Sequence, residues 1–568
     1  MAFSMLKNQS VRTERKYHRM DYCSTILIFM GGLGMFLYGM NRMAEGMQKL
    51  TGTFIKNFLE VLSDKKVMAI LVGVLITAII QSSTGTTIMV IGFVNAGILS
   101  LVQSVGIIMG ANIGTTVTGW IVSLISLGNI TYPYVVASFL VGCAAFMMVL
   151  LKNEKRKVLA DVVFGVGILF VGLYTMTNAI NQFENQDKLI RGFAFLGDKP
   201  ILAILAGILI TVILQSSSVS IGILQCASFS GLVNWETAVF LIIGQNIGTC
   251  VPALISSAGT QINAKRSAMI HLFFNVFGAI VFGLGMGIVF ANYTAFAGST
   301  ISCVGIAAFH SCFNILCAVL LYPFIRQIAR FSDIVLKSHG NEEVADDVEL
   351  TSRHLDKRIL ESPSLAVAEV TQEVVHMGEV AYESAKLAFD AVISRDLKKA
   401  KLVYEKEDMI DKMTDVISDY LVKISALPLT EEQHTSITNL FYTVSNFERM
   451  GDHSENIAEL SSYMIENNIY FSEPAYKELE GIMEIVTNSF VYSIRARRDL
   501  SEESAKKAKH YEDLVDSIEE ELRNKHMKRL ANELCKPTSG VVFLDILSNL
   551  ERISDHADNV AEYVLNEI

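Results

Sequence analysis

Two long stretches without a charged side chain constrain this sequence most. Residues 67–151 contain no Asp, Glu, Lys or Arg over 85 positions, and residues 267–325 contain none over 59. An uncharged apolar stretch of roughly 18 residues or more is typical of a helix that crosses the hydrocarbon core of a bilayer. With 51% hydrophobic residues overall, the sequence excludes a disordered chain and disfavours a soluble enzyme. We therefore expect a multi-pass membrane region.

Charge divides the chain into two halves. Residues 1–330 carry a net charge of +10 and residues 331–568 a net charge of −21, which together give −11. The eight cysteines form no CxxC pair, so no disulfide framework is expected. Residues 1–23 form a basic tail, and the apolar segment after it shows no obvious cleavage site, which predicts a retained membrane segment. We expect a membrane domain over 24–330, a linker over 331–362 and an acidic soluble domain over 363–568.

The apolar segments of the first half fall into two length classes. Segments long enough to cross a membrane are 26–43, 102–127, 132–151, 158–180, 238–258, 267–291 and 299–324. Four further segments have only 14 residues: 67–80, 86–99, 201–214 and 219–232. As helices they would be about 21 Å long, too short to cross upright. Each pair of short segments is joined by a polar turn, which predicts two re-entrant hairpins, and such backbone is tolerated at membrane depth where it lines a cavity.

The two predicted hairpins belong to an internal repeat. Residues 70–83 and 204–217 share ten identities in fourteen, and both end in Gln-Ser-Ser. A second match, Asn-Ile-Gly-Thr at 112–115 and again at 246–249, keeps the same offset of 134. Repeats of about 24–151 and 158–291, with an extra span at 299–324, account for the membrane domain.

Basic loops predict the orientation of these segments. The loop 152–157 and the pairs Lys265-Arg266 and Arg326/Arg330 are expected on the cytoplasmic side, because Lys and Arg are enriched in cytoplasmic loops. This arrangement leaves an odd number of crossings in each repeat, so the second copy is inverted and residues 331–568 are cytoplasmic. The same count places the basic tail outside, a conflict with the charge rule that the sequence leaves open.

The polar turns and the Asn-Ile-Gly-Thr breaks carry the candidate substrate and ion site. Inverted repeats with broken helices near the bilayer midplane are typical of secondary transporters. Hydroxyls and free N–H groups at helix N-termini suit an oxyanion, whereas helix carbonyls with side-chain oxygens suit Na⁺. Hydrogen bonding between neighbouring helices is the plainer interpretation for an isolated Ser, but the duplication argues against it here. The candidate residues are Gln81, Ser82, Ser83, Thr84, Asn112, Thr115, Gln215, Ser216, Ser217, Ser218, Asn246 and Thr249.

Ionisable residues are absent from these turns and breaks, which disfavours a proton relay. His271 and His310 are the histidines inside the spans, and for both we favour a hydrogen-bonded packing role over a binding role. At the two Gln-Ser-Ser turns the chain resembles the sodium-dependent phosphate cotransporter family, over about residues 24–330. The resemblance implies that phosphate and Na⁺ bind between the hairpin turns.

The acidic half is also repeated. Residues 444–460 and 547–563 share nine identities in seventeen, and the Glu-Asp-x-x-Asp segments at 407–411 and 512–516 precede them at a similar offset. Prolines at 363, 428, 474 and 537 flank helix-forming stretches and mark helix boundaries. The sequence predicts two tandem three-helix bundles, over about 363–466 and 474–568, so the whole chain is expected to be all-α.

Carboxylates in the acidic half recur four residues apart, which places them on one face of a helix. The candidate metal ligands are Glu407, Asp411, Glu448, Asp452, Glu512, Asp516, Glu551 and Asp555. A solvated acidic surface is the alternative. These segments resemble the PhoU family, which implies metal-cluster binding and regulation of phosphate uptake. Oxygen ligands favour Mg²⁺, Ca²⁺ or Mn²⁺, whereas the resemblance suggests iron or zinc, so the metal stays open.

The leading hypothesis is a Na⁺-coupled phosphate symporter of the plasma membrane with a cytoplasmic regulatory domain. Its expected partners are inorganic phosphate, sodium and membrane lipid, with a regulatory protein or a homodimer as further options. Two alternatives are a transporter of another oxyanion, such as sulfate or arsenate, and a membrane-tethered phosphate sensor that does not transport. The chain carries no nucleophile elbow, P-loop or HExxH motif, so no enzyme is expected. Nucleic-acid binding is not expected for a soluble half with a charge of −21.

Overall fold

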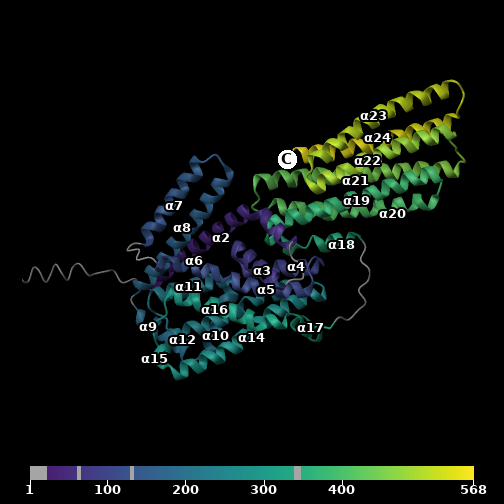
Figure 1. The fold of residues 1–568 in the computed structure, drawn as a ribbon. Coiled ribbons are helices and arrows are strands. Elements are labelled where there is room, and N and C mark those ends of the chain that lie inside the picture. Colours follow the sequence, from purple (N-terminus) through teal and green to yellow (C-terminus); the bar gives the residue numbers. More distant parts are fainter. Residues whose placement is uncertain (1–21, 61–65, 128–132, 184, 338–346) are drawn as a thin grey trace, which may run out of the picture. The chain divides into compact units, whose positions relative to one another are not determined.

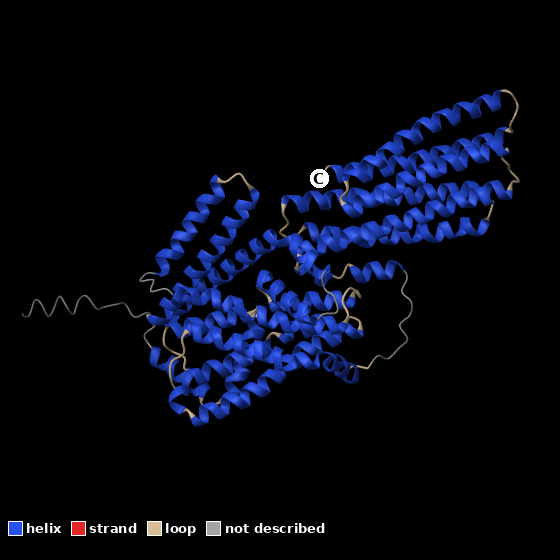
Figure 2. Cartoon of the chain, in the orientation of Figure 1, coloured by secondary structure: helices blue, strands red, loops and turns tan. Residues whose placement is uncertain are grey.

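The protein is helical throughout the part of the chain that its computed structural model describes. The described residues are 22–60, 66–127, 133–183, 185–337 and 347–568, and within them Figure 2 shows helices joined by short loops and no strand. The chain divides into two compact units, one of residues up to 341 with 357–362, and one of residues 342–356 with 363–568. The all-α prediction is confirmed, and the basic tail up to residue 21 lies outside the described residues.

The first unit contains the apolar helices of the membrane domain, coloured purple to teal in Figure 1. Its long and short helices are α2 (Tyr22–Glu60), α3 (Lys66–Ile80), α4 (Ser83–Asn95), α5 (Leu101–Gly114), α6 (Thr116–Leu127), α7 (Pro133–Leu150), α8 (Glu154–Asn181), α9 (Gln186–Gly197), α10 (Pro200–Leu214), α11 (Ser217–Phe229), α12 (Trp235–Gly248), α13 (Cys250–Ser256), α14 (Ile262–Asn292), α15 (Thr294–Ala297), α16 (Cys303–Leu321) and α17 (Ile325–Val335). Two 3₁₀ helices, η1 (Tyr322–Phe324) and η2 (Lys357–Glu361), complete the unit.

Six stretches among the described residues are long and apolar enough to cross a membrane. They are Tyr22–Thr51, Leu101–Leu124, Glu154–Asn181, Trp235–Ser256, Ile262–Asn292 and Cys303–Val335. The chain is thus a multi-pass membrane protein. The short helices α3, α4, α10 and α11 lie where the sequence predicted the hairpin arms, and α10 follows α9 at a bend of 112°. Helix α9 was missed, because its apolar residues alternate with Asp187, Lys188 and Arg191.

Glycines show that the two repeats pack in the same way. An added Cβ at Gly110 of α5 would lie 2.0 Å from the Ile70 carbonyl oxygen of α3, and one at Gly244 of α12 would lie 2.0 Å from the Ile204 carbonyl oxygen of α10. These positions differ by 134. Only glycine permits backbones to approach so closely, as in other membrane helix pairs. In both repeats the first hairpin arm therefore packs directly on the broken span that follows the hairpin.

Helices α2 and α8, which precede the two hairpins, pack antiparallel. Gly32 of α2 faces Gly172 of α8, and Gly39 faces Gly165, with added Cβ atoms 2.6–2.9 Å from the facing carbonyl oxygens. Residue numbers rise on one helix as they fall on the other, so the helices run in opposite directions. Inversion of the repeats predicts this relation, but their placement relative to a membrane stays a prediction.

The segment 331–362, expected to be a linker, contains ordered helices. Helix α17 continues to Val335, α18 spans Asp347–His354, and η2 spans Lys357–Glu361, while 338–346 lie outside the described residues. Residues 357–362 belong to the first unit, because η2 packs on α4. This packing joins residues about 270 positions apart, and no local pattern in the sequence indicates it.

The second unit consists of α18 and six long helices, drawn in green to yellow in Figure 1. The six are α19 (Pro363–Ser394), α20 (Leu397–Ser425), α21 (Glu431–Glu466), α22 (Glu473–Asp499), α23 (Glu502–Ala531) and α24 (Pro537–Leu565). Helices α19–α21 pack together, as do α22–α24, and α21 packs on α24. The predicted pair of three-helix bundles has the helix boundaries that the prolines mark.

Candidate substrate and metal sites

The first polar turn reverses the chain between α3 and α4. Gln81 adopts a left-handed backbone conformation, with φ of 58°, and its side-chain amide donates to the Ala78 carbonyl. Ser82 caps α4, since its Oγ accepts from the Gly85 N–H at 3.0 Å. A non-glycine residue in this conformation costs free energy, so the surrounding structure must hold the turn in place.

The second turn repeats this geometry between α10 and α11. Gln215 has φ of 52°, and Ser216 Oγ accepts from the Val219 N–H at 3.3 Å. The arms of each hairpin are also linked in the same way, through Thr77 and Thr86 at 3.0 Å and through Thr211 and Ser220 at 3.1 Å. All these residue pairs differ by 134, so the two polar turns are structural equivalents.

Thr118 of α6 links the two turns. Its Oγ1 donates to Gln81 Oε1 at 2.9 Å and lies 3.3 Å from Ser218 Oγ. Turns 134 residues apart in the sequence thus meet at one point, as a shared site requires. The sequence prediction missed Thr118, although it is a hydroxyl residue only three positions after the Thr115 of the first Asn-Ile-Gly-Thr break.

The two turns differ in burial. Gln81 is 4% exposed, whereas Gln215 is exposed. The residue equivalent to Thr118 in the second repeat is Pro252, which has no side-chain donor. The first glutamine is therefore held by a hydroxyl that the second copy lacks.

The Asn-Ile-Gly-Thr segments end α5 and α12, as predicted for broken spans. Asn112 donates to the Ile108 carbonyl at 3.1 Å and Asn246 to the Ile242 carbonyl at 3.0 Å. Both asparagines, like Thr115 and Thr249, are at most 5% exposed. His310 Nε2 lies 3.2 Å from Asn246 Oδ1, so this histidine contacts a candidate site residue. His271 is buried without a hydrogen bond to either ring nitrogen.

The remaining hairpin residues line the starts of α4 and α11. Ser83, Ser217 and Ser218 are buried, while Ser82, Thr84 and Ser216 are partly exposed. The two helix starts offer N–H groups and hydroxyls, a donor set that suits an oxyanion. Two buried side-chain acceptors on α11 and α12, Gln225 Oε1 and Gln245 Oε1, lack a hydrogen-bond partner.

In the second unit, the predicted acidic faces approach each other within each bundle. Glu407 and Asp411 lie on α20, and Glu448 and Asp452 on α21. Burial, and then the charge of Asp411, raises the pKa of Glu407 to about 7. Burial and the neighbouring Asp452 also raise the pKa of Glu448. Carboxylates that share one site favour protonation or a bound cation.

The second acidic cluster is the tighter one. Carboxylate oxygens of Glu512, Asp516 and Asp555 lie within 4.8 Å of one another, the one such group among the described residues. Burial and then Asp516 raise the pKa of Glu512 to about 7, and burial and then Glu551 raise that of Asp555 to about 6. An all-carboxylate donor set fits a divalent cation, because oxygen ligands suit hard ions.

Each cluster includes an acidic residue that the sequence prediction missed. Glu455 raises the pKa of Glu407, and Asp558 raises that of Glu512. Glu455 and Asp558 are equivalent residues at the offset of 103, one turn after Asp452 and Asp555. The repeat could have revealed them, because both copies are acidic at this position even though the residue type differs.

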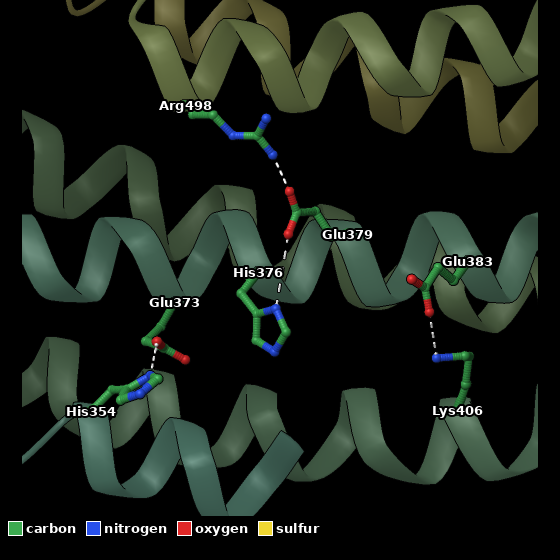
Figure 3. A network of polar contacts seen from close by, with 7 residues as sticks. All are labelled: His354, Glu373, His376, Glu379, Glu383, Lys406 and Arg498. Atoms are coloured by element: carbon green, nitrogen blue, oxygen red, sulfur yellow. Dashed lines mark hydrogen bonds and ion pairs between the residues drawn. The ribbon is translucent and has the colours of Figure 1, made fainter. Parts of the chain in front are cut away.

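Polar contacts tie the second unit together around α19. Figure 3 shows His354 of α18 against Glu373, Lys406 of α20 against Glu383, and Arg498 of α22 against Glu379. Glu373 Oε1 lies 2.6 Å from His354 Nδ1 and accepts its hydrogen bond, which raises the pKa of His354. Helix α19 is thus joined to its own bundle, to α18 and to the second bundle.

These features define a class of protein: a multi-pass membrane protein with two equivalent polar hairpins, joined to a helical domain with acidic clusters. The Na⁺/Pi-cotransporter family model matches residues 35–178 and 175–309, and the PhoU domain model matches 374–461 and 479–564. The chain therefore belongs to the Na⁺/Pi-cotransporter family and carries a C-terminal PhoU domain. Each model matches twice, in agreement with the repeats.

Similar proteins share either the whole architecture or one half. The "Putative inorganic phosphate export protein YjbB" of Escherichia coli K12 is 21% identical over 548 residues, 96% of this chain and 98% of that protein. The "Uncharacterized protein YqeW" of Bacillus subtilis is 28% identical and spans 55% of this chain and 98% of its own length. A Thermotoga maritima PhoU homologue is 28% identical over 32% of this chain and 78% of its own length. The crystal structure of PhoU from Pseudomonas aeruginosa covers 36% of this chain and 96% of its own, at 23% identity and a TM-score of 0.34.

Proposed function

We propose that the protein moves inorganic phosphate across the plasma membrane by symport with sodium, and that its PhoU domain regulates this transport from the cytoplasm. The observation that carries the proposal is the meeting of the two equivalent turns through Thr118. Phosphate would be bound by N–H and hydroxyl donors at the starts of α4 and α11. Sodium would be bound by side-chain and main-chain oxygens of the same turns and breaks.

A divalent cation in the PhoU domain would neutralise the carboxylates of Glu512, Asp516 and Asp555 and so hold α23 against α24. These residues come from two helices, and their oxygens are already within 4.8 Å of one another. Glu407, Asp411, Glu448 and Asp452 would act likewise between α20 and α21. Metal binding would thereby set the rigidity of each bundle.

Phosphate uptake by the reconstituted full-length protein tests the proposal. Radiolabelled phosphate should accumulate in proteoliposomes under an inward Na⁺ gradient and much less under a matched K⁺ gradient. Competition by sulfate or arsenate at equal concentration would indicate a broader oxyanion transporter. Phosphate binding without any flux under either gradient would favour a sensor.

Export is a second candidate, favoured by the YjbB protein that matches almost the whole chain. A symporter follows the sum of its substrate gradients, so the same binding site serves both directions. Vesicles loaded with phosphate distinguish the two. Efflux that persists against an inward Na⁺ gradient would support export, whereas efflux only with an outward Na⁺ gradient would support reversible symport.

A further inference from the structure

The six residues 357–362 belong to a different unit from the chain on either side of them. They pack with the transporter helices, whereas residues 342–356 and 363–568 belong to the PhoU-containing unit. Just before them, the Asp356 carbonyl accepts from the Tyr420 hydroxyl at 3.2 Å, and His354 pairs with Glu373. Just after them, α19 begins at Pro363. The chain on both sides of this short segment therefore belongs to the PhoU-containing unit.

Helix η2 packs on a face of α4 that is formed by two glycines, and we call this face the glycine seat. Gly85 and Gly92 are seven residues apart and lie on the same face of α4. An added Cβ at Gly92 would lie 3.0 Å from Arg358 Cβ, and one at Gly85 would lie 3.3 Å from Glu361 Oε2. Ile359, which faces Gly92, is fully buried.

The second hairpin lacks this seat. At the offset of 134, the positions of Gly85 and Gly92 hold Val219 and Cys226, which carry side chains and are buried in other contacts. The two hairpin turns are equivalent in their polar residues but not in this face. The glycines of α4 are thus explained by the packing of η2 rather than by the hairpin geometry that both copies share.

Arg358 connects η2 to the second repeat as well. Its Nε donates to the Ser256 carbonyl at 2.8 Å, and its Nη2 donates to the Ala258 carbonyl at 3.4 Å. Ser256 is the last residue of α13, so the guanidinium caps the carbonyl end of the second broken span. One short segment therefore contacts α4 of the first repeat and α13 of the second.

We propose that η2 is a strap that restrains the two transporter repeats relative to each other, and that the PhoU-containing unit sets the transport rate by seating or releasing this strap. Alternating access moves one repeat or bundle against another around a fixed site. A segment bound to both repeats opposes that movement. The inference rests on the proposed transport function and adds the part of the chain through which the regulatory unit acts.

Uptake by full-length protein in proteoliposomes, measured with radiolabelled phosphate, tests the strap. Arg358→Ala removes the contact with α13, and the initial rate should rise about fivefold, which corresponds to the loss of about 1 kcal/mol of restraint. Lys357→Ala is the matched control, because Lys357 is an exposed residue of the same helix. An Arg358→Ala rate equal to or below the wild-type rate, in protein that elutes as a single species, would overturn the proposal.

A reversible cross-link tests the strap by strengthening its contact with α4 instead of weakening its contacts. Gly92→Cys combined with Arg358→Cys places two Cβ atoms about 3.0 Å apart, close to the 3.5–4.5 Å of a disulfide after a small shift. Oxidation should reduce transport at least tenfold, and reduction should restore it to above the wild-type rate, because Arg358 is absent. The two single-cysteine variants control for the eight native thiols.

The outcomes of this experiment separate the two proposals. Wild-type protein that moves no phosphate under any gradient contradicts the transport function. A different result contradicts the strap alone. In that result the wild-type protein is active, and the double-cysteine variant transports equally well even though mass spectrometry shows that the cross-link has formed.

Discussion

At the residue scale, the two glutamines of the polar turns have the same backbone and different surroundings. Gln81 accepts a hydrogen bond from Thr118 and is almost fully buried, while Gln215 is exposed and has Pro252 where Thr118 would be. Loss of one buried hydrogen bond costs about 1–3 kcal/mol, because the partner is left unpaired. The two positions should therefore contribute unequally to stability, even where both contact substrate.

We predict that Gln81→Ala lowers the melting temperature of the purified protein, whereas Gln215→Ala leaves it within error of the wild type. Both should reduce phosphate transport by about tenfold or more, since each removes a ligand from the proposed site. Thermal unfolding in detergent and uptake in proteoliposomes measure the two effects. Equal melting temperatures for the two variants would contradict the assigned role of Thr118.

The acidic clusters predict how stability depends on pH. The pKa values of Glu407 and Glu512 are about 7 in the folded protein, well above the ordinary value near 4.3. The folded state thus binds more protons than the unfolded state, and the stability that these protons provide is lost as the pH rises through about 7. The contribution of these two groups to the melting temperature of the metal-free fragment 363–568 should therefore fall from about pH 5 to about pH 7 and change little above that.

Divalent metal should remove most of that pH dependence, because a cation replaces the protons. His453 and His556 have lowered pKa values, and their effect has the opposite sign, since they destabilise the folded state as the pH falls below about 6.5. Glu512→Gln is the test variant, and Glu502→Gln, on the exposed start of the same helix, is the control. If the Glu512→Gln fragment gains as much stability from metal as the wild-type fragment does, Glu512 is not a metal ligand. The acidic residues then form a solvated surface.

At the element scale, glycines determine how the hairpins pack on the broken spans. Gly110 and Gly244 bring two backbones together at equivalent places, and an added methyl group would overlap a carbonyl oxygen in each. These oxygens belong to helix backbone, which cannot move aside as the end of a flexible side chain can. The packing of α3 on α5 and of α10 on α12 therefore depends on these positions.

We predict that Gly110→Ala destabilises the protein by about 1–3 kcal/mol, the usual cost of overpacking, or prevents folding. Gly283→Ala in α14 is the control, because an added Cβ there meets no atom within 4 Å. Fluorescence-detected size exclusion after heating compares the two variants. Similar unfolding temperatures would contradict the close packing of α3 on α5.

Many of the helices and their boundaries could be predicted from the sequence. Fourteen-residue apolar segments on either side of Gln-Ser-Ser indicated the hairpin arms, and four prolines marked the helices of the second unit. Thr118 was missed, because its partners lie 37 and 100 residues away in the sequence. The strap was missed for the same reason, since a five-residue helix has no pattern that reveals what it packs on.

At the scale of the whole molecule, the PhoU domain is a pair of bundles joined by reciprocal contacts. His453 of the first bundle lies 3.0 Å from Asn549 Oδ1 of the second, and His556 of the second lies 2.8 Å from Asn446 Oδ1 of the first. These contacts relate equivalent residues across the interface of α21 and α24. Each bundle thus buries part of its surface only against the other.

We predict that the fragment 363–568 unfolds in one cooperative transition, whereas the single bundle 363–466 is far less stable. The reason is that the single bundle exposes the face of α21 that packs on α24. Circular dichroism at 222 nm during heating measures both. Two separate transitions in the longer fragment, or equal stability of the shorter one, would show that the bundles are independent.

The unequal copies have a consequence for the energies of the transport cycle. In a carrier made of two identical inverted copies, the inward-facing and outward-facing states would be exchanged by symmetry and would have equal free energies. Here Thr118 has Pro252 as its counterpart, and the glycine seat of the strap has Val219 and Cys226. In the proposed transporter with inverted repeats, such differences remove the symmetry that would give the two facing states equal free energies. We therefore expect the protein without substrate to populate one facing state more than the other.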